Sequence, residues 1–468
     1  MKVAKTKVPT RETIVSLDLG AIHKAYEYQT PYQKVGKVVS NNGSVYEISL
    51  GRAVIGANVE FVTEFGDSSL GEVVAIKGNR CLAMPYDELP GINSETRVYL
   101  KGLTTQIKIS YEMLGRVVDF QGNPIDDKGP IEGDKELRSI FGEALNPLQR
   151  PPIKEALDTG IHSINCFMTA GKGQRLAIMA GSGVGKSVTM GMIAKNTNAD
   201  INVIALIGER GREVLEFIEG DLGEEGLKRS VVIVATSDQS PLIRAKAAYS
   251  ATTIAEYFRD QNHDVLFMMD SITRFAMAYR EIGLNAGEPP GQKGYPPGVF
   301  ARLPKLMERA GTKANSGTIT GLYTVLVEGG DMDEPIADAV RAISDGHIIL
   351  SRDLAAKNQF PAIDILQSLS RVMNKVVSRE HRIVSSHLRD LMAAYKNNED
   401  LINVGAYAAG SNIKVDKAIA IYDDLMELMR QIQDMNEPMS IEDLFDQMVE
   451  LARKAENSVG VSTNEGAN

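Results

Sequence analysis

The stretch RLAIMAGSGVGKSVTMGMIAKN, residues 175–196, decides the fold. It reads as a buried strand, a glycine-rich turn and a helix, in that order. Gly181, Gly183 and Gly185 let the backbone of the turn curl, so that successive N–H groups point at phosphate oxygens. The start of the helix adds its partial positive charge. This order of elements is typical of the phosphate-binding loop of a nucleotide-binding α/β domain.

The side chains of this loop point to a nucleotide bound together with magnesium. Lys186 can reach the β- and γ-phosphates, and the Ser187 hydroxyl can ligate Mg²⁺. Ala180 replaces the first glycine of the usual pattern, at a position that demands a small residue more than a positive φ. The predicted nucleotide-binding residues of the loop are Gly181, Ser182, Gly183, Val184, Gly185, Lys186, Ser187 and Val188.

The chain around the loop alternates strands and helices. Its candidate strands are mostly continuous apolar runs, as expected when both faces of a sheet are covered. They span 175–180, 201–208, 230–237, 264–270, 317–328 and 346–351. Helical patterns separate them, for example at 241–260. We therefore predict an open, mostly parallel α/β sheet.

Two carboxylates follow strands of this sheet and indicate hydrolysis rather than binding alone. Asp270 ends one strand and Glu209 follows another, and parallel strands present their carboxyl ends at one edge. Asp270 could hold a magnesium-bound water, and Glu209 could polarise the water that attacks the γ-phosphate. Two plainer interpretations stay open: Asp270 as the cap of the next helix, and Glu209 as a solvated carboxylate paired with Arg210 or Arg212.

Arg371 is a third candidate for catalysis. Phosphoryl transfer spreads charge over the γ-oxygens, which an arginine finger can stabilise. Nothing in the local sequence shows that Arg371 reaches the site of its own chain, and a surface salt bridge is the alternative interpretation.

Composition limits the class of protein. The chain has 468 residues, enough for about three domains, with 51 Lys and Arg against 61 Asp and Glu. The net charge of −10 argues against a protein that coats nucleic acid or anionic membrane. With only Cys81 and Cys166, no disulfide framework is expected, which favours the reducing cytoplasm. The basic start lacks the apolar core of a secretory signal.

The pattern of elements predicts several domains. Short Val-rich runs between Gly and Asn turns indicate a small β-barrel before the sheet, and helical spacing dominates after it. The expected parts are an N-terminal segment at 1–26, a β-barrel at 27–105, the nucleotide-binding domain at 106–384, a helical domain at 385–455 and a disordered tail at 456–468. Ser440 and Asp443 mark the start of a last helix at 441–455.

Several long motifs together resemble the flagellum-specific and type III secretion export ATPase family, which is itself similar to the catalytic subunits of rotary F- and V-type ATPases. The motifs are AGSGVGKS (180–187), IGERGREVLEFIE (207–219), DSITRFAMAYREIG (270–283), GEPPGQKGYPPGVFARLPKLMERAG (287–311), EGGDMDEPIADAVRAISDGHIILSR (328–352) and FPAIDILQSLSR (360–371). The resemblance runs from about residue 30 to about residue 435.

The resemblance implies an N-terminal β-barrel, a RecA-like ATPase domain and a C-terminal helical domain, assembled as a homohexameric ring with ATP at the subunit interfaces. It assigns Lys186 to phosphate, Ser187 and Asp270 to Mg²⁺, Glu209 to the attacking water, Arg210 and Arg274 to the γ-phosphate, Arg371 to a finger delivered in trans, and Phe360 to the adenine ring. Phe360 has an alternative interpretation as an apolar residue before Pro361.

The resemblance also implies partners and a location. The family powers export of flagellar or other secreted proteins beside a membrane export gate, at the cytoplasmic face of the export apparatus. A negative regulator would dock on residues 1–26, and substrates with their chaperones on the C-terminal domain. A coiled-coil stalk protein would enter the central pore, faced by loops 287–298 and 328–335. Acidic Asp331, Asp333 and Glu334 could meet basic groups of that stalk.

Four other functions compete with flagellar export. A virulence secretion ATPase shares all these motifs. A rotary ATP synthase subunit would carry an acidic lever run, which the stretch 402–419 lacks. A non-hydrolysing scaffold usually loses the catalytic acid, whereas both Lys186 and Glu209 are present. A hexameric RNA translocase would need a basic, aromatic barrel, and residues 27–105 hold both signs of charge, so no nucleic acid is expected.

Overall fold

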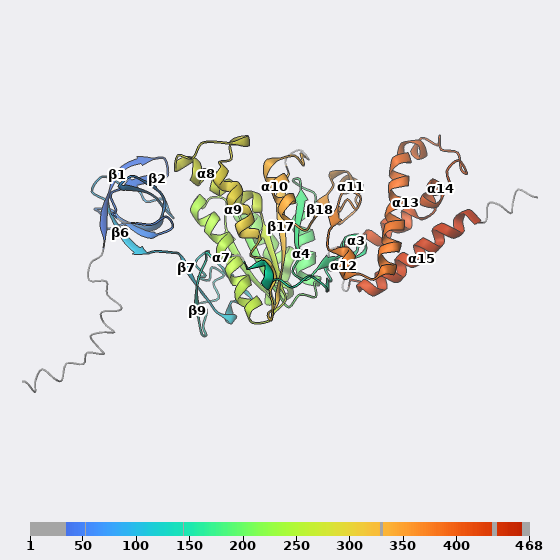
Figure 1. Ribbon diagram of the computed structural model, residues 1–468, viewed down its shortest axis with the longest axis horizontal. Helices are drawn as coiled ribbons and strands as arrows, with labels where there is room; N and C mark the ends of the chain where they lie inside the picture. Colours follow the sequence, from blue (N-terminus) through green and yellow to red (C-terminus); the bar gives the residue numbers. More distant parts are fainter. Residues whose placement is uncertain (1–33, 52, 144, 328–330, 433–437, 461–468) are drawn as a thin grey trace, which may run out of the picture. The chain divides into compact units, whose positions relative to one another are not determined.

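The computed structural model describes residues 34–51, 53–143, 145–327, 331–432 and 438–460. The chain divides into two compact units, one ending at Leu103 and the other beginning at Thr104 (Figure 1). The expected segment at 1–26 lies outside the described residues. Within the described ranges, no helix combines the length and the apolar character needed to cross a bilayer.

The first unit is a closed β-barrel. Its strands follow the order β1-β2-β5-β4-β3-β6 around the barrel. Their bounds are β1 Val35–Asn42, β2 Val45–Ile48, β3 Asn58–Val62, β4 Ser68–Lys77, β5 Arg80–Pro85 and β6 Arg97–Gly102. Side chains alternate inward and outward along β3, so that Val59 and Phe61 are fully buried while their neighbours are not. Closure removes exposed strand edges, which explains how so small a sheet is stable.

The second unit is built on a large sheet in the order β19-β18-β12-β17-β15-β13-β14-β8. The strands from β18 to β8 all run parallel. Strand β19 pairs antiparallel with β18 at one edge, and the short β16 pairs antiparallel with the start of β17. All six predicted strands are present. The bounds are β8 Arg116–Val118, β12 Arg175–Ala180, β13 Ile201–Ile207, β14 Ser230–Ala235, β15 Val265–Asp270, β16 Gly311–Thr312, β17 Thr318–Leu326, β18 Gly346–Leu350 and β19 Leu369–Ser370.

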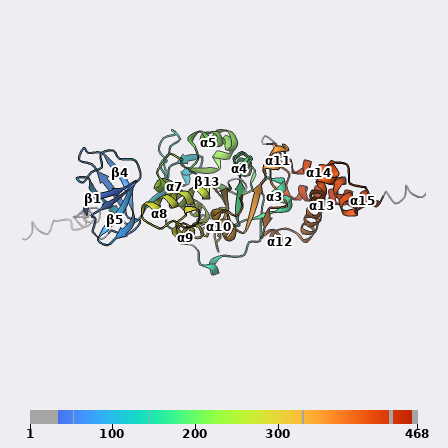
Figure 2. The ribbon, with the colours of Figure 1, turned by 90° about the horizontal axis from the view of Figure 1, so that it is seen from above.

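Helices cover both faces of this sheet, and Figures 1 and 2 show α4 and α9 on opposite sides of it. Every residue of β13, β14 and β15 is buried as a result. The helices are α3 His162–Phe167, α4 Lys186–Asn196, α5 Gly211–Glu216, the π-helix η3 Phe217–Leu222, α6 Gly223–Lys228, α7 Pro241–Asp260, α8 Ile272–Asn285, α9 Pro297–Met307, α10 Pro335–Ile343, α11 Arg352–Ala356 and α12 Met373–Val376.

Short elements complete the second unit. Strands β7 Gln106–Ile109 and β9 Glu136–Ser139 form one small sheet, and β10 Ala156–Leu157 and β11 Ala170–Gly171 form another. The 3-10 turns are η1 Tyr111–Met113, η2 Pro147–Gln149 and η4 Gln292–Gly294.

The last three helices, α13 Arg379–Asn403, α14 Ile413–Met429 and α15 Ile441–Gly460, share one hydrophobic core with the nucleotide-binding part. Ser440 accepts a hydrogen bond from the Asp443 N–H at 3.1 Å and so marks the start of α15. The predicted end of this helix, at 455, is wrong, and residues 461–468 of the predicted tail lie outside the described residues. Helix α15 continues to Gly460, and Glu456 is held by Lys417 at 2.6 Å.

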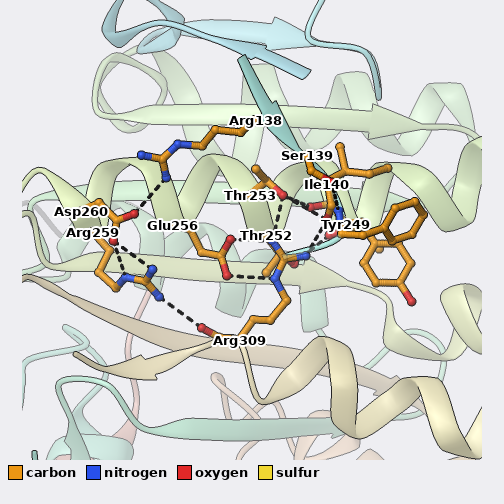
Figure 3. Close-up of polar contacts among 12 residues, drawn as sticks. Arg138, Ser139, Ile140, Tyr249, Thr252, Thr253, Glu256, Arg259, Asp260 and Arg309 are labelled. Atoms are coloured by element: carbon orange, nitrogen blue, oxygen red, sulfur yellow. Dashed lines mark hydrogen bonds and ion pairs between the residues drawn. The ribbon is translucent and has the colours of Figure 1, made fainter. Parts of the chain in front are cut away.

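A buried ionic network joins α7 to the end of α9 (Figure 3). The Arg309 side chain is only 1% exposed and forms two hydrogen bonds to Glu256, at 2.9 Å from Nε and 2.6 Å from Nη2. Its remaining donors reach the Ile140 carbonyl at 2.7 Å and Thr253 Oγ1 at 2.8 Å. The connector that follows β9 is thereby fixed to α7 through Arg309.

Removing one partner of this network should destabilise the fold strongly. We expect Glu256→Ala to lower the free energy of unfolding by about 3–5 kcal/mol, because the Arg309 guanidinium would remain buried without its counter-charge. Urea denaturation followed by circular dichroism measures the change. Glu225→Ala, which breaks an exposed pair with Lys228, is the control and should change stability little. Equal effects of the two substitutions would contradict this account.

Candidate active site

The phosphate loop joins the end of β12 to the start of α4. Gly183 and Gly185 have φ values of 76° and 84°, in the left-handed region that favours glycine. Ala180 closes β12 in extended backbone, which explains why alanine serves at that position. Lys186 is the first residue of α4, so its side chain and the free N–H groups of the helix start face the same space.

The carboxyl edge of the sheet brings three charged groups together. Lys186 Nζ lies 2.5 Å from Asp270 Oδ1 and 3.6 Å from Glu209 Oε1. The Lys186 and Glu209 side chains are each 14% exposed and that of Asp270 5%. Their strands β12, β13 and β15 are parallel, so this meeting follows from the topology.

Asp270 is oriented by the neighbouring strand. The Thr324 hydroxyl on β17 donates to Asp270 Oδ1 at 2.7 Å. The cap of α8 is Ser271, whose side chain accepts from the Arg274 N–H at 3.2 Å. The alternative in which Asp270 is that cap therefore does not describe the structure.

Glu209 faces the loop rather than its neighbouring arginines. Arg210 and Arg212 form ion pairs with carboxylates on α5 instead, at 3.5 Å and 2.7 Å. Burial, together with the negative charge of Asp270, raises the pKa of Glu209 to about 7, although Lys186 acts in the opposite direction. A carboxylate with a pKa near neutrality is well matched to accepting a proton from water.

The residues at this edge fit a magnesium ion that arrives with a nucleotide. Mg²⁺ prefers oxygen ligands and is usually held by one or two carboxylates together with substrate phosphates. Asp270 supplies a buried carboxylate, Ser187 a hydroxyl on the first turn of α4, and Thr324 fixes the carboxylate. Among the described residues, no cluster of three or more His, Cys, Asp or Glu could hold a metal without such a substrate.

A cavity of about 440 Å³ lies beside the loop. Gly185 and Val188 line one wall, Phe360 another, and Arg430 and Gln431 a third. The Phe360 ring is close to the loop, because a Cβ added at Gly185 would lie 3.6 Å from it. Phe360 is 38% exposed, so its ring is accessible from the cavity side.

The arginines assigned to the γ-phosphate differ in placement. Arg274 on α8 is partly buried against Gly208, where an added Cβ would lie 3.0 Å from its side chain, and its Nε lacks a hydrogen-bond partner. The Arg210 side chain is 81% exposed and points to its partner on α5. Arg274 therefore has unused hydrogen-bonding capacity near the end of β13, and Arg210 is held on the surface.

Arg371 is far from the phosphate loop of its own chain. Its backbone N–H donates to the Asp345 carbonyl at 2.9 Å, at the amino end of β18, whereas the loop follows the carboxyl end of β12. Its side chain is exposed and makes no hydrogen bond or ion pair with any residue of the described ranges. The alternative of a surface salt bridge is therefore not seen.

Arg352 lies at the site but was not predicted from the sequence. Leu350 pairs with Ala180 in the sheet, so the residues after β18 run alongside the phosphate loop. A Cβ added at Gly181 would lie 3.0 Å from both Nε and Nη2 of Arg352, which places the guanidinium against the loop. A cation directly after a predicted parallel strand was the available signal, but the position of that strand beside β12 could not be read from the sequence.

A glycine-rich loop, a lysine and two acids at the carboxyl edge of a parallel sheet define a P-loop nucleoside triphosphatase. Three family models match: the β-barrel domain of the ATP synthase alpha/beta family at 38–102, its nucleotide-binding domain at 160–370, and the type III secretion EscN ATPase C-terminal domain at 377–450.

Similar proteins cover nearly the whole chain. A flagellum-specific ATP synthase of Bacillus subtilis is 50% identical over 89% of this chain and 95% of its own. A type 3 secretion system ATPase of Xanthomonas euvesicatoria is 46% identical over 92% and 95%. The assembled ATPase EscN from the enteropathogenic E. coli type III secretion system has a TM-score of 0.84 and 42% identity, over 89% of this chain and 99% of that one.

The chain belongs to the flagellum-specific and type III secretion ATPase family. The predicted combination of a β-barrel, a parallel-sheet nucleotide-binding domain and a helical C-terminal region is confirmed. The predicted enzyme class, an ATPase, is confirmed as well.

Proposed function

We propose that this protein hydrolyses MgATP as a homohexameric ring and that this hydrolysis powers export of flagellar proteins through a type III secretion apparatus. The observation that carries the proposal is the meeting of Lys186, Glu209 and Asp270 beside the phosphate loop. The match of residues 377–450 to the secretion ATPase C-terminal model favours export over ATP synthesis. The relatives named as flagellum-specific, at up to 50% identity, favour flagellar over virulence substrates.

In this proposal the residues of the site divide the reaction among them. Lys186 and the loop N–H groups hold the phosphates. Glu209 accepts a hydrogen bond from the attacking water and then takes its proton. Ser187 and Asp270 would hold Mg²⁺, which would neutralise charge on the phosphate oxygens.

The arginines and Phe360 complete the proposed site. Arg274 approaches the γ-phosphate, and Arg210 does so after it releases its carboxylate partner on α5. Arg371 acts on the γ-phosphate of the neighbouring subunit, and Phe360 stacks on the adenine. Arg352, which lies against the loop at Gly181, adds positive charge beside the phosphates.

The proposed assembly places the protein at the cytoplasmic face of the export apparatus, beside the membrane export gate. EscN has been solved as an assembled ATPase in complex with its central stalk EscO, and its structure has a TM-score of 0.81 to this chain. We propose that a basic coiled-coil stalk meets exposed Asp331 and Asp333, and Glu334 beside them. Lys293 Nζ already lies 3.1 Å from Asp331 Oδ2 and joins the two proposed pore loops.

Each of the remaining proposed partners binds a different predicted part of the chain. A negative regulator binds residues 1–26, before the β-barrel at 27–105. Export substrates and chaperones bind the helical domain at 385–455, which follows the ATPase domain at 106–384.

The first test of the proposed function is loss of nucleotide binding in Lys186→Ala. A charge-assisted hydrogen bond contributes about 1.5–3 kcal/mol, so we expect ATP to bind about 10–150-fold more weakly by titration calorimetry. The control is Lys195→Ala, near the end of the same helix and remote from the loop. Unchanged ATP affinity in Lys186→Ala, or no hydrolysis of ATP by the unaltered protein with Mg²⁺, would contradict the proposal.

Hydrolysis should also depend on pH near neutrality. The pKa of Glu209 is raised to about 7, and only its deprotonated form can accept a proton. The ratio kcat/KM for ATP, which reports groups of the free enzyme, should therefore rise with pH, by about tenfold between pH 6 and pH 8. Phosphate release measured across this range gives the profile. A flat profile would argue against Glu209 as the proton acceptor.

A further inference from the structure

Gln431, two residues after the end of α14, is bonded to the loop that carries Phe360. Its backbone N–H donates to the Phe360 carbonyl at 2.8 Å, although the two residues are far apart in the sequence. Gln431 is only 3% exposed, and it also lines the 440 Å³ cavity beside the phosphate loop.

The side-chain amide of Gln431 is held at both ends. Its Oε1 accepts from the His162 N–H at 2.8 Å, and its Nε2 donates to the Gly160 carbonyl at 2.8 Å. A buried amide with both ends paired has one preferred orientation, and loss of either bond leaves a buried polar group unsatisfied. Gln431 is therefore a fixed point between the start of α3 and the Phe360 loop.

Two neighbouring contacts extend this connection along the last turn of α14. His162 Nδ1 lies 2.8 Å from the Leu428 carbonyl, and Nδ1 must donate because a carbonyl only accepts. Gln359 Nε2 donates to the Met426 carbonyl at 3.0 Å. Gln359, the residue before Phe360, is thus held to α14, as is His162 at the start of α3.

We propose that Gln431 is a positioning residue that holds Phe360 in the wall of the cavity and so selects nucleotides that carry a base. The inference rests on the proposed function and deepens it, because it assigns part of the affinity for ATP to the helical region. The chemistry recognised is a flat aromatic base against the Phe360 ring, whereas the groups proposed to hold the phosphates form no hydrogen bond with Gln431. Loss of the Gln431 amide should then weaken base recognition and leave phosphate recognition unchanged.

The test compares ATP with inorganic tripolyphosphate, which lacks the base, on the full chain. Gln431→Met keeps the length of the side chain and removes its amide. We expect ATP to bind about tenfold more weakly, a loss within the range measured for single base–aromatic stacks, while tripolyphosphate binds as before. The Michaelis constant for ATP should rise by a similar factor and kcat should stay nearly constant, because a base contact is made equally in the ground and transition states.

Three variants complete the design. Gln367→Met is the matched control. The Gln367 amide donates to Asp364 Oδ2 at 2.7 Å, and neither residue lines the 440 Å³ cavity. Gln431→Glu retains the acceptor for the His162 N–H and should lose less affinity than Gln431→Met. In a Phe360→Ala background, Gln431→Met should cause little further loss, because the two residues act through one contact.

The outcomes separate this inference from the proposed function. Equal weakening of ATP and tripolyphosphate, unchanged ATP affinity in Gln431→Met, or fully additive losses with Phe360→Ala would each overturn the positioning role. If Gln431→Met does not fold, Gln431→Glu must show the selective loss of ATP affinity, or the inference is wrong. An unaltered protein that binds neither compound would instead contradict the proposed function itself.

Discussion

Arg371→Ala chains are expected to hydrolyse ATP about 10³–10⁵-fold more slowly than the unaltered protein, the range known for arginine fingers. The position of Arg371 in the structure explains why it should act at the ATP site of a neighbouring chain and not at its own. Arg371 emerges beside Asp345 at the amino edge of the sheet, opposite the phosphate loop, and its exposed side chain has no ion pair within the described ranges. Its guanidinium is therefore available to a second copy. Phosphate release at saturating ATP measures the loss.

Mixing variants tests whether the arginine acts in trans. When Arg371→Ala chains are mixed with Glu209→Gln chains, some interfaces combine an intact Glu209 with an intact Arg371, and part of the activity should return. Arg382→Ala removes another exposed arginine, near the start of α13, and should leave the rate unchanged. A mixture no more active than its two components would remove the support for a finger supplied by a neighbour.

Glu209→Gln should lower the hydrolysis rate by about 10²–10⁴-fold, the contribution typical of a general base, while ATP binding is retained. The amide has the same shape as the carboxyl group but cannot accept a proton from water. Binding should persist because Lys186, the principal phosphate contact, keeps Asp270 at 2.5 Å as its partner. Single-turnover hydrolysis and calorimetric titration measure the two properties separately.

The matched control for this substitution is Glu216→Gln. Glu216 lies on α5 in an exposed pair with Arg212 and should be neutral for hydrolysis. Hydrolysis at the normal rate in Glu209→Gln would refute the role of Glu209. Loss of ATP binding in the same variant would indicate instead that Glu209 organises the loop.

The sequence predicted the parts of the site that depend on local order and on parallel strands. A buried strand, a glycine-rich turn and a helix place Lys186 without further knowledge, and acids that end parallel strands must share its edge. Glu209 and Asp270 are therefore found beside Lys186, as expected from their positions after β13 and β15.

The parts that escaped prediction depend on contacts between distant residues. Arg352 reaches the loop only because β18 lies next to β12, and strand order is not encoded in any short motif. Gln431 bonds Gly160 across 271 residues of sequence. The end of α15 was missed for a similar reason, since Glu456 is held by Lys417 on another helix.

The walls of the cavity beside the phosphate loop are completed late during synthesis. A nascent chain that has emerged as far as α13 already contains the whole loop, Glu209, Asp270 and Phe360, but not Arg430 or Gln431. If Gln431 positions Phe360 as proposed, full affinity for ATP is reached only after residues 430 and 431 have been synthesised.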